Sequence, residues 1–118
     1  MSKEAFITSY VLDDDILVIR LHGDLDAFTT DEFNAQVKKH LEDGHAKIII
    51  DCAHLGYVSS VGIGALVALQ KRLRDRGGRV KLAAIQGTVA EVLKILHLGK
   101  VLDIHGDIEF ARQSFDEE

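Results

Sequence analysis

Apolar, β-branched segments alternate with segments of helical periodicity, and this alternation restricts the possible folds more than any other feature of the sequence. The runs Lys47–Asp51 and Val80–Ala84 have the composition of buried strands. Between them, apolar or small residues recur on one face of a predicted helix, namely Gly62, Ala65, Leu66, Leu69 and Leu73. Strand, helix and strand in this order imply parallel strands joined by a right-handed crossover.

The chain opens with a predicted hairpin. Phe6–Val11 and Ile16–Leu21 are apolar, β-branched runs, and the acidic triplet Asp13–Asp15 between them favours a turn. We read the triplet as a solvated turn rather than a metal site, because no second cluster of ligands accompanies it. The hairpin adds antiparallel pairing to an otherwise mostly parallel sheet. The sequence therefore predicts one α/β domain with a mixed sheet over residues 1–118, its core at about residues 5–113.

Capping-box spacing predicts two helix starts, Thr29 with Glu32 and Thr88 with Glu91. Gly23–Asp26 is expected to be the loop before the first of these helices. The first helix is expected to bury Phe33, Val37 and Leu41 and to end at Gly44, and the helix that follows Ser59 and Ser60 is expected to end at Gly77–Gly78. The helix that starts at Thr88 is expected to bury Val89, Val92, Leu93 and Leu96. A last strand Val101–Ile104 and a last helix Asp107–Gln113 complete the predicted fold.

Composition excludes several classes of protein. The formal net charge is −5, and the basic group Lys71–Arg76 suits the end of a helix, so a nucleic-acid partner is not expected. No apolar stretch approaches the roughly 18 residues of a membrane helix, and Met1–Glu4 do not begin a signal peptide, so we expect a cytoplasmic protein without membrane insertion. The single Cys52 follows a buried run, which predicts a half-buried structural thiol.

The most unusual segment is Tyr57–Gly64, in which Ser59 and Ser60 stand at the start of a predicted helix. Either serine can cap the helix, but capping accounts for only one of them. The outer face of this helix begins with Gly64, Val67 and Ala68, which carry no charge. Such a patch is either a docking surface or a face covered by the chain's own loops. A phosphate on a serine here would lie at a helix N-terminus, which accommodates anions.

Several segments together resemble the STAS domain family, named for sulphate transporters and anti-sigma factor antagonists. The strand Ile48–Asp51 and the following segment Leu55–Gly64 are similar to the family signature, and Gly23–Asp26 is similar to its Gly-Glu/Asp-Leu-Asp segment. Gly77–Leu82 and Val89–Leu98 match its later half in kind and spacing.

The resemblance implies an anti-sigma factor antagonist that acts by partner switching. In that branch, the serine two residues before the glycine of the motif, here Ser60, accepts phosphate from an anti-sigma factor that is itself a serine protein kinase. The unphosphorylated antagonist binds this kinase, and a phosphatase resets the cycle. Asp26 is implied to lie near the phosphorylated serine. The chain departs from the family pattern with Ser59 in place of an aspartate and with Val61 after the phosphorylated position.

The predicted function is therefore reversible docking, without catalysis, cofactor or metal. The predicted phosphorylation site is Ser60, and the predicted partner-binding residues are Asp24, Asp26, Ser59, Gly62, Gly64, Val67 and Ala68. The alternative is a non-phosphorylated STAS binding subunit of a lipid-transport ABC system or of a stress-signalling complex.

Enzymatic alternatives lack their defining residues. Asp51 ends a strand as in a phosphate-accepting receiver, but the acidic neighbours and the lysine at a later strand end are missing. Gly62-Ile63-Gly64 lacks the third glycine of a dinucleotide fingerprint. Cys52 has Val58 rather than arginine six positions later, which excludes a thiol-phosphatase loop, and the six histidines show no metal-ligand spacing.

Overall fold

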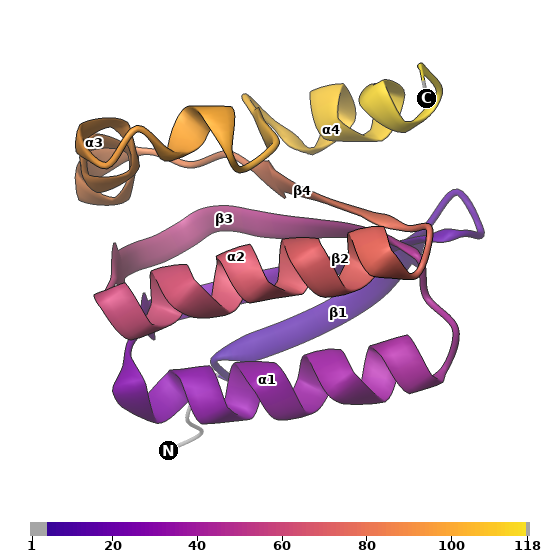
Figure 1. Cartoon of the computed structure of the whole chain (residues 1–118), viewed down its shortest axis with the longest axis horizontal. Helices are drawn as coiled ribbons and strands as arrows, with labels where there is room; N and C mark the ends of the chain where they lie inside the picture. Colours follow the sequence, from indigo (N-terminus) through magenta and orange to yellow (C-terminus); the bar gives the residue numbers. More distant parts are fainter. Residues whose placement is uncertain (1–4, 118) are drawn as a thin grey trace.

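A mixed five-stranded sheet forms the middle layer of the protein in a computed structural model that describes residues 5–117 (Figure 1). The strands lie in the order β1-β2-β3-β4-β5. Only the β1–β2 pair is antiparallel, and the other pairs are parallel. The elements are β1 (Ile7–Leu12), β2 (Ile16–Leu25), α1 (Ala27–Glu42), β3 (Lys47–Val58), α2 (Ser60–Asp75), β4 (Arg79–Ala83), α3 (Gly87–Ile95), the 3-10 helix η1 (Leu98–Lys100), β5 (Ile104–His105) and α4 (Ile108–Phe115). The predicted single α/β domain with an N-terminal hairpin is confirmed.

Both faces of the sheet are covered because its central strands are apolar on both sides. Leu17 and Ile19 of β2 point into a large cluster that also contains side chains of α1, α2 and α3. Ile16 and Val18, one residue out of phase, point to the other face, where α4 supplies Ala111 and Phe115. Figure 1 shows α1 and α2 in front of the strands, and the second cluster places α4 on the opposite face.

The stripes predicted for the first two helices are confirmed. Phe33, Val37 and Leu41 of α1 are buried, as are Gly62, Ala65, Leu66, Leu69 and Leu73 of α2. Gly44 and Gly77 follow these helices with positive φ angles of 92° and 79°, a conformation that glycine adopts without strain.

Several local predictions are wrong. Gly23–Leu25 are not a loop, because β2 continues through them beside β3 with register shifts at Arg20/His22 and Gly23/Asp24. Thr29 is not the cap of α1 but its third residue, and Asp26 is the cap. Thr88 and Glu91 form no capping box, since α3 begins at Gly87 after Gln86 and has no side-chain cap.

The remaining errors concern the C-terminal region. Leu96 is 52% exposed, because α3 ends one residue earlier and His97 adopts a left-handed conformation. The last strand is only Ile104–His105, shorter than the predicted Val101–Ile104. The segment before it contains the 3-10 helix η1 at Leu98–Lys100 instead. Within residues 5–117, no helix is both long enough and apolar enough to cross a membrane.

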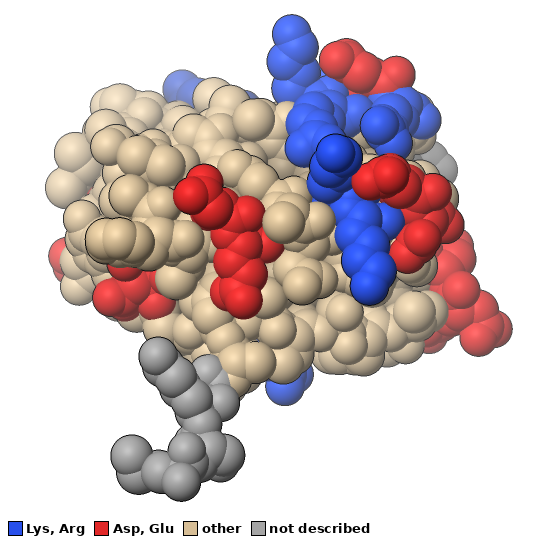
Figure 2. Space-filling model, turned by 90° about the horizontal axis from the view of Figure 1, so that it is seen from below, with Lys and Arg blue, Asp and Glu red and all other residues tan. Residues whose placement is uncertain are grey.

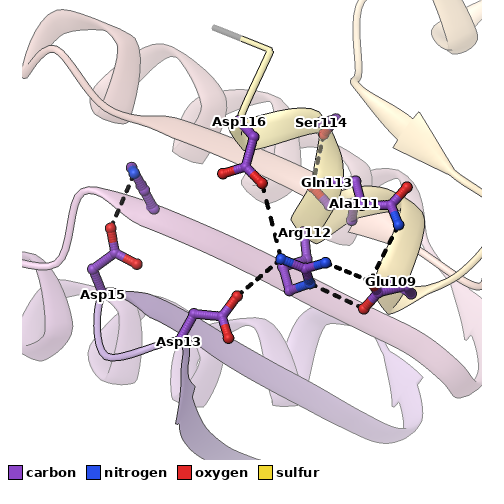
Figure 3. A network of polar contacts seen from close by, with 9 residues as sticks. Asp13, Asp15, Glu109, Ala111, Arg112, Gln113, Ser114 and Asp116 are labelled. Carbon is purple, nitrogen blue, oxygen red and sulfur yellow. Dashed lines mark hydrogen bonds and ion pairs between the residues drawn. The ribbon is translucent and has the colours of Figure 1, made fainter.

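Helix α4 is fastened to the hairpin by the side chain of Arg112 (Figure 3). Its guanidinium donates to Asp13 in the β1–β2 turn at 3.1 Å, and to Glu109 within α4. The hydrogen bonds to Glu109 and Asp13 raise the pKa of Arg112 above its ordinary value. Residues 99 positions apart in the chain are thereby joined at the surface.

Candidate functional site

The two serines at the start of α2 have different roles in the structure. Ser59 is the helix cap, and its hydroxyl oxygen accepts a hydrogen bond from the N–H of Gly62 at 3.2 Å. Its own N–H donates to the carbonyl of Leu25 at 2.9 Å, which joins the start of α2 to the end of β2. Ser60 is the first residue of α2 and is exposed. Its hydroxyl makes no hydrogen bond with any residue in the described range 5–117.

Asp26 caps α1 next to this junction. Its Oδ1 accepts hydrogen bonds from the N–H of Thr29 at 3.1 Å and of Phe28 at 2.9 Å, while the Thr29 hydroxyl accepts from the Asp26 N–H at 2.9 Å. The Thr29 N–H and then the Phe28 N–H lower the pKa of the Asp26 carboxyl below its ordinary value. Asp26 is therefore a fixed negative charge at neutral pH, and its first task is to start α1.

Asp24 is exposed near the C-terminal end of β2, and its register partner in β3 is Tyr57. A Cβ atom built on Gly56 would lie 3.6 Å from its Oδ1, so the carboxylate extends over the backbone of β3. Asp24, Asp26, Ser59 and Ser60 thus lie at the same end of the sheet, where β2 and β3 finish and α1 and α2 start (Figure 1).

The four predicted contact residues on α2 divide into two groups. Gly64 and Ala68 are exposed, as expected of a docking surface. Val67 is half-buried and packs against the main core cluster. Gly62 is buried, and a Cβ there would lie 2.6 Å from the Leu25 carbonyl oxygen and 3.0 Å from Val58 Cγ2. Gly62 therefore allows β2 and α2 to approach closely, and its assignment to an accessible contact surface is wrong.

Three exposed apolar side chains near the serines were not singled out from the sequence. Val61 is 51% exposed, Tyr57 is 48% exposed, and Phe28 on α1 is 89% exposed. A signal for Phe28 was present, because it falls outside the stripe that continues through Phe33 and Val37. Exposed aromatic side chains beside an uncharged patch are typical of protein-binding surfaces.

The charge distribution sets this end of the molecule apart. No lysine or arginine occurs between Arg20 and Lys38 or between Lys47 and Lys71. In Figure 2 the basic side chains gather mainly in the right half, whereas the left half, where α1 and α2 begin, is mostly uncharged or acidic. The surface around Ser60 is consequently apolar at its centre with carboxylates at its border.

Two further residues considered from the sequence have structural roles. Asp51 is 3% exposed, and its carboxylate accepts from Arg20 Nε and from the Ala53 N–H, each at 3.0 Å. Cys52 is 1% exposed and thus fully rather than half buried. Burial, followed by the nearby Asp51 charge, raises the pKa of its thiol to about 12, which makes it an inert core residue. Within residues 5–117, no three potential metal ligands gather in one place.

Comparisons with known proteins identify the family and the fold. The model of the STAS domain family matches residues 9–111. BtrV of Bordetella bronchiseptica, provisionally assigned as an anti-sigma factor antagonist, is 24% identical over 102 residues, which are 86% of this chain and 88% of BtrV.

Two solved structures share the fold. A Thermotoga maritima protein, also provisionally assigned as an anti-sigma factor antagonist, superposes with a TM-score of 0.85 at 21% identity over 92% of each chain. The anti-sigma factor antagonist SpoIIAA superposes in its unphosphorylated form with a TM-score of 0.71 at 21% identity, over 94% of this chain and 96% of SpoIIAA. Its phosphorylated form, from Bacillus, gives 0.70 at 22% identity, over 92% and 98%.

Proposed function

The chain belongs to the STAS domain family, and from this premise we propose that it is an anti-sigma factor antagonist that works by partner switching. In this proposal it docks to an anti-sigma factor that is also a serine protein kinase. Phosphorylation of Ser60 releases it, and a phosphatase restores the docking form. The proposed setting of the cycle is the cytoplasm, and the protein itself performs no catalysis.

The observation that carries the proposal is the environment of Ser60. Its hydroxyl is exposed and makes no hydrogen bond within residues 5–117, while the neighbouring Ser59 has taken over the capping of α2. A kinase can therefore reach Ser60 without breaking an interaction that holds the fold. The exposed side chains of Val61, Tyr57 and Phe28 at the same end provide the apolar area that a protein partner would cover.

A phosphate on Ser60 would act on docking rather than on folding. It adds about −1.5 to −2 charges at the N-terminus of α2, where the helix dipole and the free N–H groups of the first turn favour an anion. The same charge would have to be dehydrated when a partner covers Val61 and Tyr57, which opposes association. That one relative has been solved in both an unphosphorylated and a phosphorylated form supports this use of the fold.

The departures from the family pattern favour a second candidate function. Ser59 stands where an aspartate precedes the phosphorylated serine in the antagonist branch, and Val61 follows it. A STAS binding subunit of a lipid-transport ABC system or of a stress-signalling complex would use the same surface without phosphorylation.

Phosphopeptide mass spectrometry on protein from growing and from stressed native cells tests the proposal first. We expect phosphate on Ser60, in an amount that changes with the condition. With the co-purified anti-sigma factor, Ser60→Ala should bind as the wild type does and accept no phosphate. Ser60→Asp should bind at least about tenfold more weakly. Ser9→Asp, at an exposed serine of β1, is the matched control for added charge.

Two results would reverse this assignment. If Ser60 stays unmodified in every condition and a transporter or sensor complex co-purifies, the binding-subunit function replaces partner switching. If Ser60→Asp and Ser9→Asp bind the anti-sigma factor equally well, Ser60 is not the switch.

A further inference from the structure

We propose that a pocket bounded by α2, β4 and the η1 segment binds a phosphate ester of a sugar. The pocket has a volume of about 330 Å³, at the lower end of the range for small-molecule sites. The residues that carry the argument are Gln70 and Arg74 of α2, Arg79 of β4, Lys100 of η1, and Asp103. The pocket lies along the C-terminal half of α2, away from Ser60.

Three cationic side chains from three separate elements line this pocket. Arg74, Arg79 and Lys100 belong to α2, β4 and η1, in a chain whose net charge is −5. The dipole of α2 accounts for a cation at Arg74, but not for those at Arg79 and Lys100. Neither Arg74 nor Lys100 forms an ion pair within residues 5–117. Arg79 Nη1 donates to the Gly78 carbonyl at 2.7 Å, which leaves most of its guanidinium N–H groups available.

The one carboxylate in the wall is already neutralised. Asp103 Oδ2 lies 2.8 Å from Lys81 Nζ, and Oδ1 lies 2.7 Å from His105 Nε2. The pocket therefore keeps an excess of positive charge. Guanidinium groups bind phosphoryl oxygens through paired hydrogen bonds, whereas lysine supplies a point charge. A phosphate monoester is the small anion that such a set recognises best.

Gln70 indicates that the ligand carries more than a phosphoryl group. Its Nε2 donates to the Val101 carbonyl, which fixes the orientation of the amide. Its Oε1 is buried and has no hydrogen-bond partner within the described residues. A buried acceptor without a donor costs free energy, so a ligand that offers a hydroxyl gains affinity there. Inorganic phosphate satisfies the cations with its single phosphoryl group, whereas a sugar ester carries separate hydroxyls that can donate to Gln70 while the phosphoryl group binds the cations.

Titration of the full chain with ribose 5-phosphate, followed by amide NMR, tests the proposal. We expect saturable shifts centred on Gln70, Arg74 and Gly99–Val101. Inorganic phosphate and free ribose are the two partial probes. Each should bind at least about tenfold more weakly than ribose 5-phosphate, because inorganic phosphate lacks the sugar hydroxyls and ribose lacks the phosphoryl group.

Variants separate the site from general charge attraction. Arg74→Gln combined with Lys100→Gln should weaken binding of ribose 5-phosphate by at least about tenfold. The matched control is Arg72→Gln, at an exposed arginine of the same helix that does not line the pocket. Gln70→Leu should remove the preference for ribose 5-phosphate over inorganic phosphate.

The proposal is overturned if ribose 5-phosphate produces no saturable shifts, or if Arg72→Gln weakens binding as much as the double variant does. Equal affinity for inorganic phosphate and ribose 5-phosphate in the wild type would overturn the assignment of the sugar. The thermal unfolding of each variant shows whether the fold is intact, so a lost fold cannot be mistaken for a lost site.

Discussion

Ser59 and Ser60 are adjacent in the sequence, yet their hydroxyls meet different surroundings at the start of α2. Ser59 has the extended backbone of a cap residue and bonds to the Gly62 N–H, whereas Ser60 is already helical and faces solvent. The sequence alone allowed either serine to cap the helix, because a one-residue change in the helix start exchanges the two roles. The Leu25 carbonyl selects Ser59 by accepting its N–H, and this contact between distant residues is not visible in the sequence.

Gly62 and Gly64 lie two residues apart in α2 and should respond to alanine in opposite ways. A Cβ at Gly62 would meet Leu25 and Val58, so Gly62→Ala should lower the free energy of unfolding by about 1–3 kcal/mol through overpacking. No atom lies within 4 Å of a Cβ at Gly64, so Gly64→Ala should raise it by up to about 1 kcal/mol through helix propensity. Urea denaturation of both variants measures the difference. Equal effects of the two substitutions would contradict the close approach of β2 and α2.

At the scale of elements, the predictions succeeded where the hydrophobic pattern reports burial directly. The stripe through Phe33 and Val37 marks the buried face of α1, and the continuous apolar run Ile16–Ile19 marks a strand buried on both faces. The extension of β2 through Gly23–Leu25 could not be predicted, because glycine and aspartate are poor strand formers. The neighbouring β3 provides the hydrogen bonds that keep this segment extended despite its bulges.

The C-terminal elements show the same limit. Two residues are enough for β5 because β4 pairs with it and because Lys81, buried in β4, lies 2.8 Å from Asp103 just before it. A buried lysine and its partner 22 residues later form a tertiary contact, which local propensity does not encode. The longer strand Val101–Ile104 was expected from its β-branched composition alone.

The Asp103–Lys81 pair predicts how the β4–β5 region responds to acid. Burial raises the pKa of the Asp103 carboxyl, but the hydrogen bond and charge of Lys81, followed by those of His105, outweigh it, so the net pKa is lowered. A carboxyl whose pKa is lower in the folded than in the unfolded state stabilises the fold at pH values above its unfolded-state pKa. This contribution is lost as the pH falls below about 4. Asp103→Asn should therefore lower the free energy of unfolding by only about 1 kcal/mol at neutral pH. The effect is this small because the carboxylate is 44% exposed and solvent screens its charge.

Thermal unfolding between neutral and acid pH measures this difference. The stability of Asp103→Asn should fall less steeply than that of the wild type as the pH drops below about 4. Glu91→Gln, at an exposed carboxylate of α3, is the control that should leave the acid limb of the profile unchanged. Parallel profiles for wild type and Asp103→Asn would show that the pair does not contribute.

On the scale of the whole molecule, the residues of the candidate docking surface come from both halves of the crossover. Asp24 and Asp26 are separated from Ser59 and Ser60 by more than 30 positions, and parallel pairing of β2 with β3 brings them to one end of the sheet. The sequence placed Ser59 and Ser60 correctly at a helix start, but it put Asp24 and Asp26 in a loop, whereas Asp24 belongs to β2 and Asp26 caps α1. It missed the exposure of Phe28 and Tyr57, because exposure depends on which neighbours fail to cover a side chain.

Two strongly exposed apolar side chains at different places on the molecule provide the last test. Phe28 at the start of α1 is 89% exposed, and Ile95 at the end of α3 is 74% exposed. If the anti-sigma factor docks around Ser60, Phe28→Ala should weaken its binding by about tenfold, as loss of an aromatic anchor does. Ile95→Ala, the matched control, should bind as the wild type does. Neither substitution should change the free energy of unfolding by more than about 0.5 kcal/mol, because both side chains are exposed. Calorimetric titration with the anti-sigma factor decides between the surfaces, since a loss confined to Ile95→Ala would move the docking surface to α3.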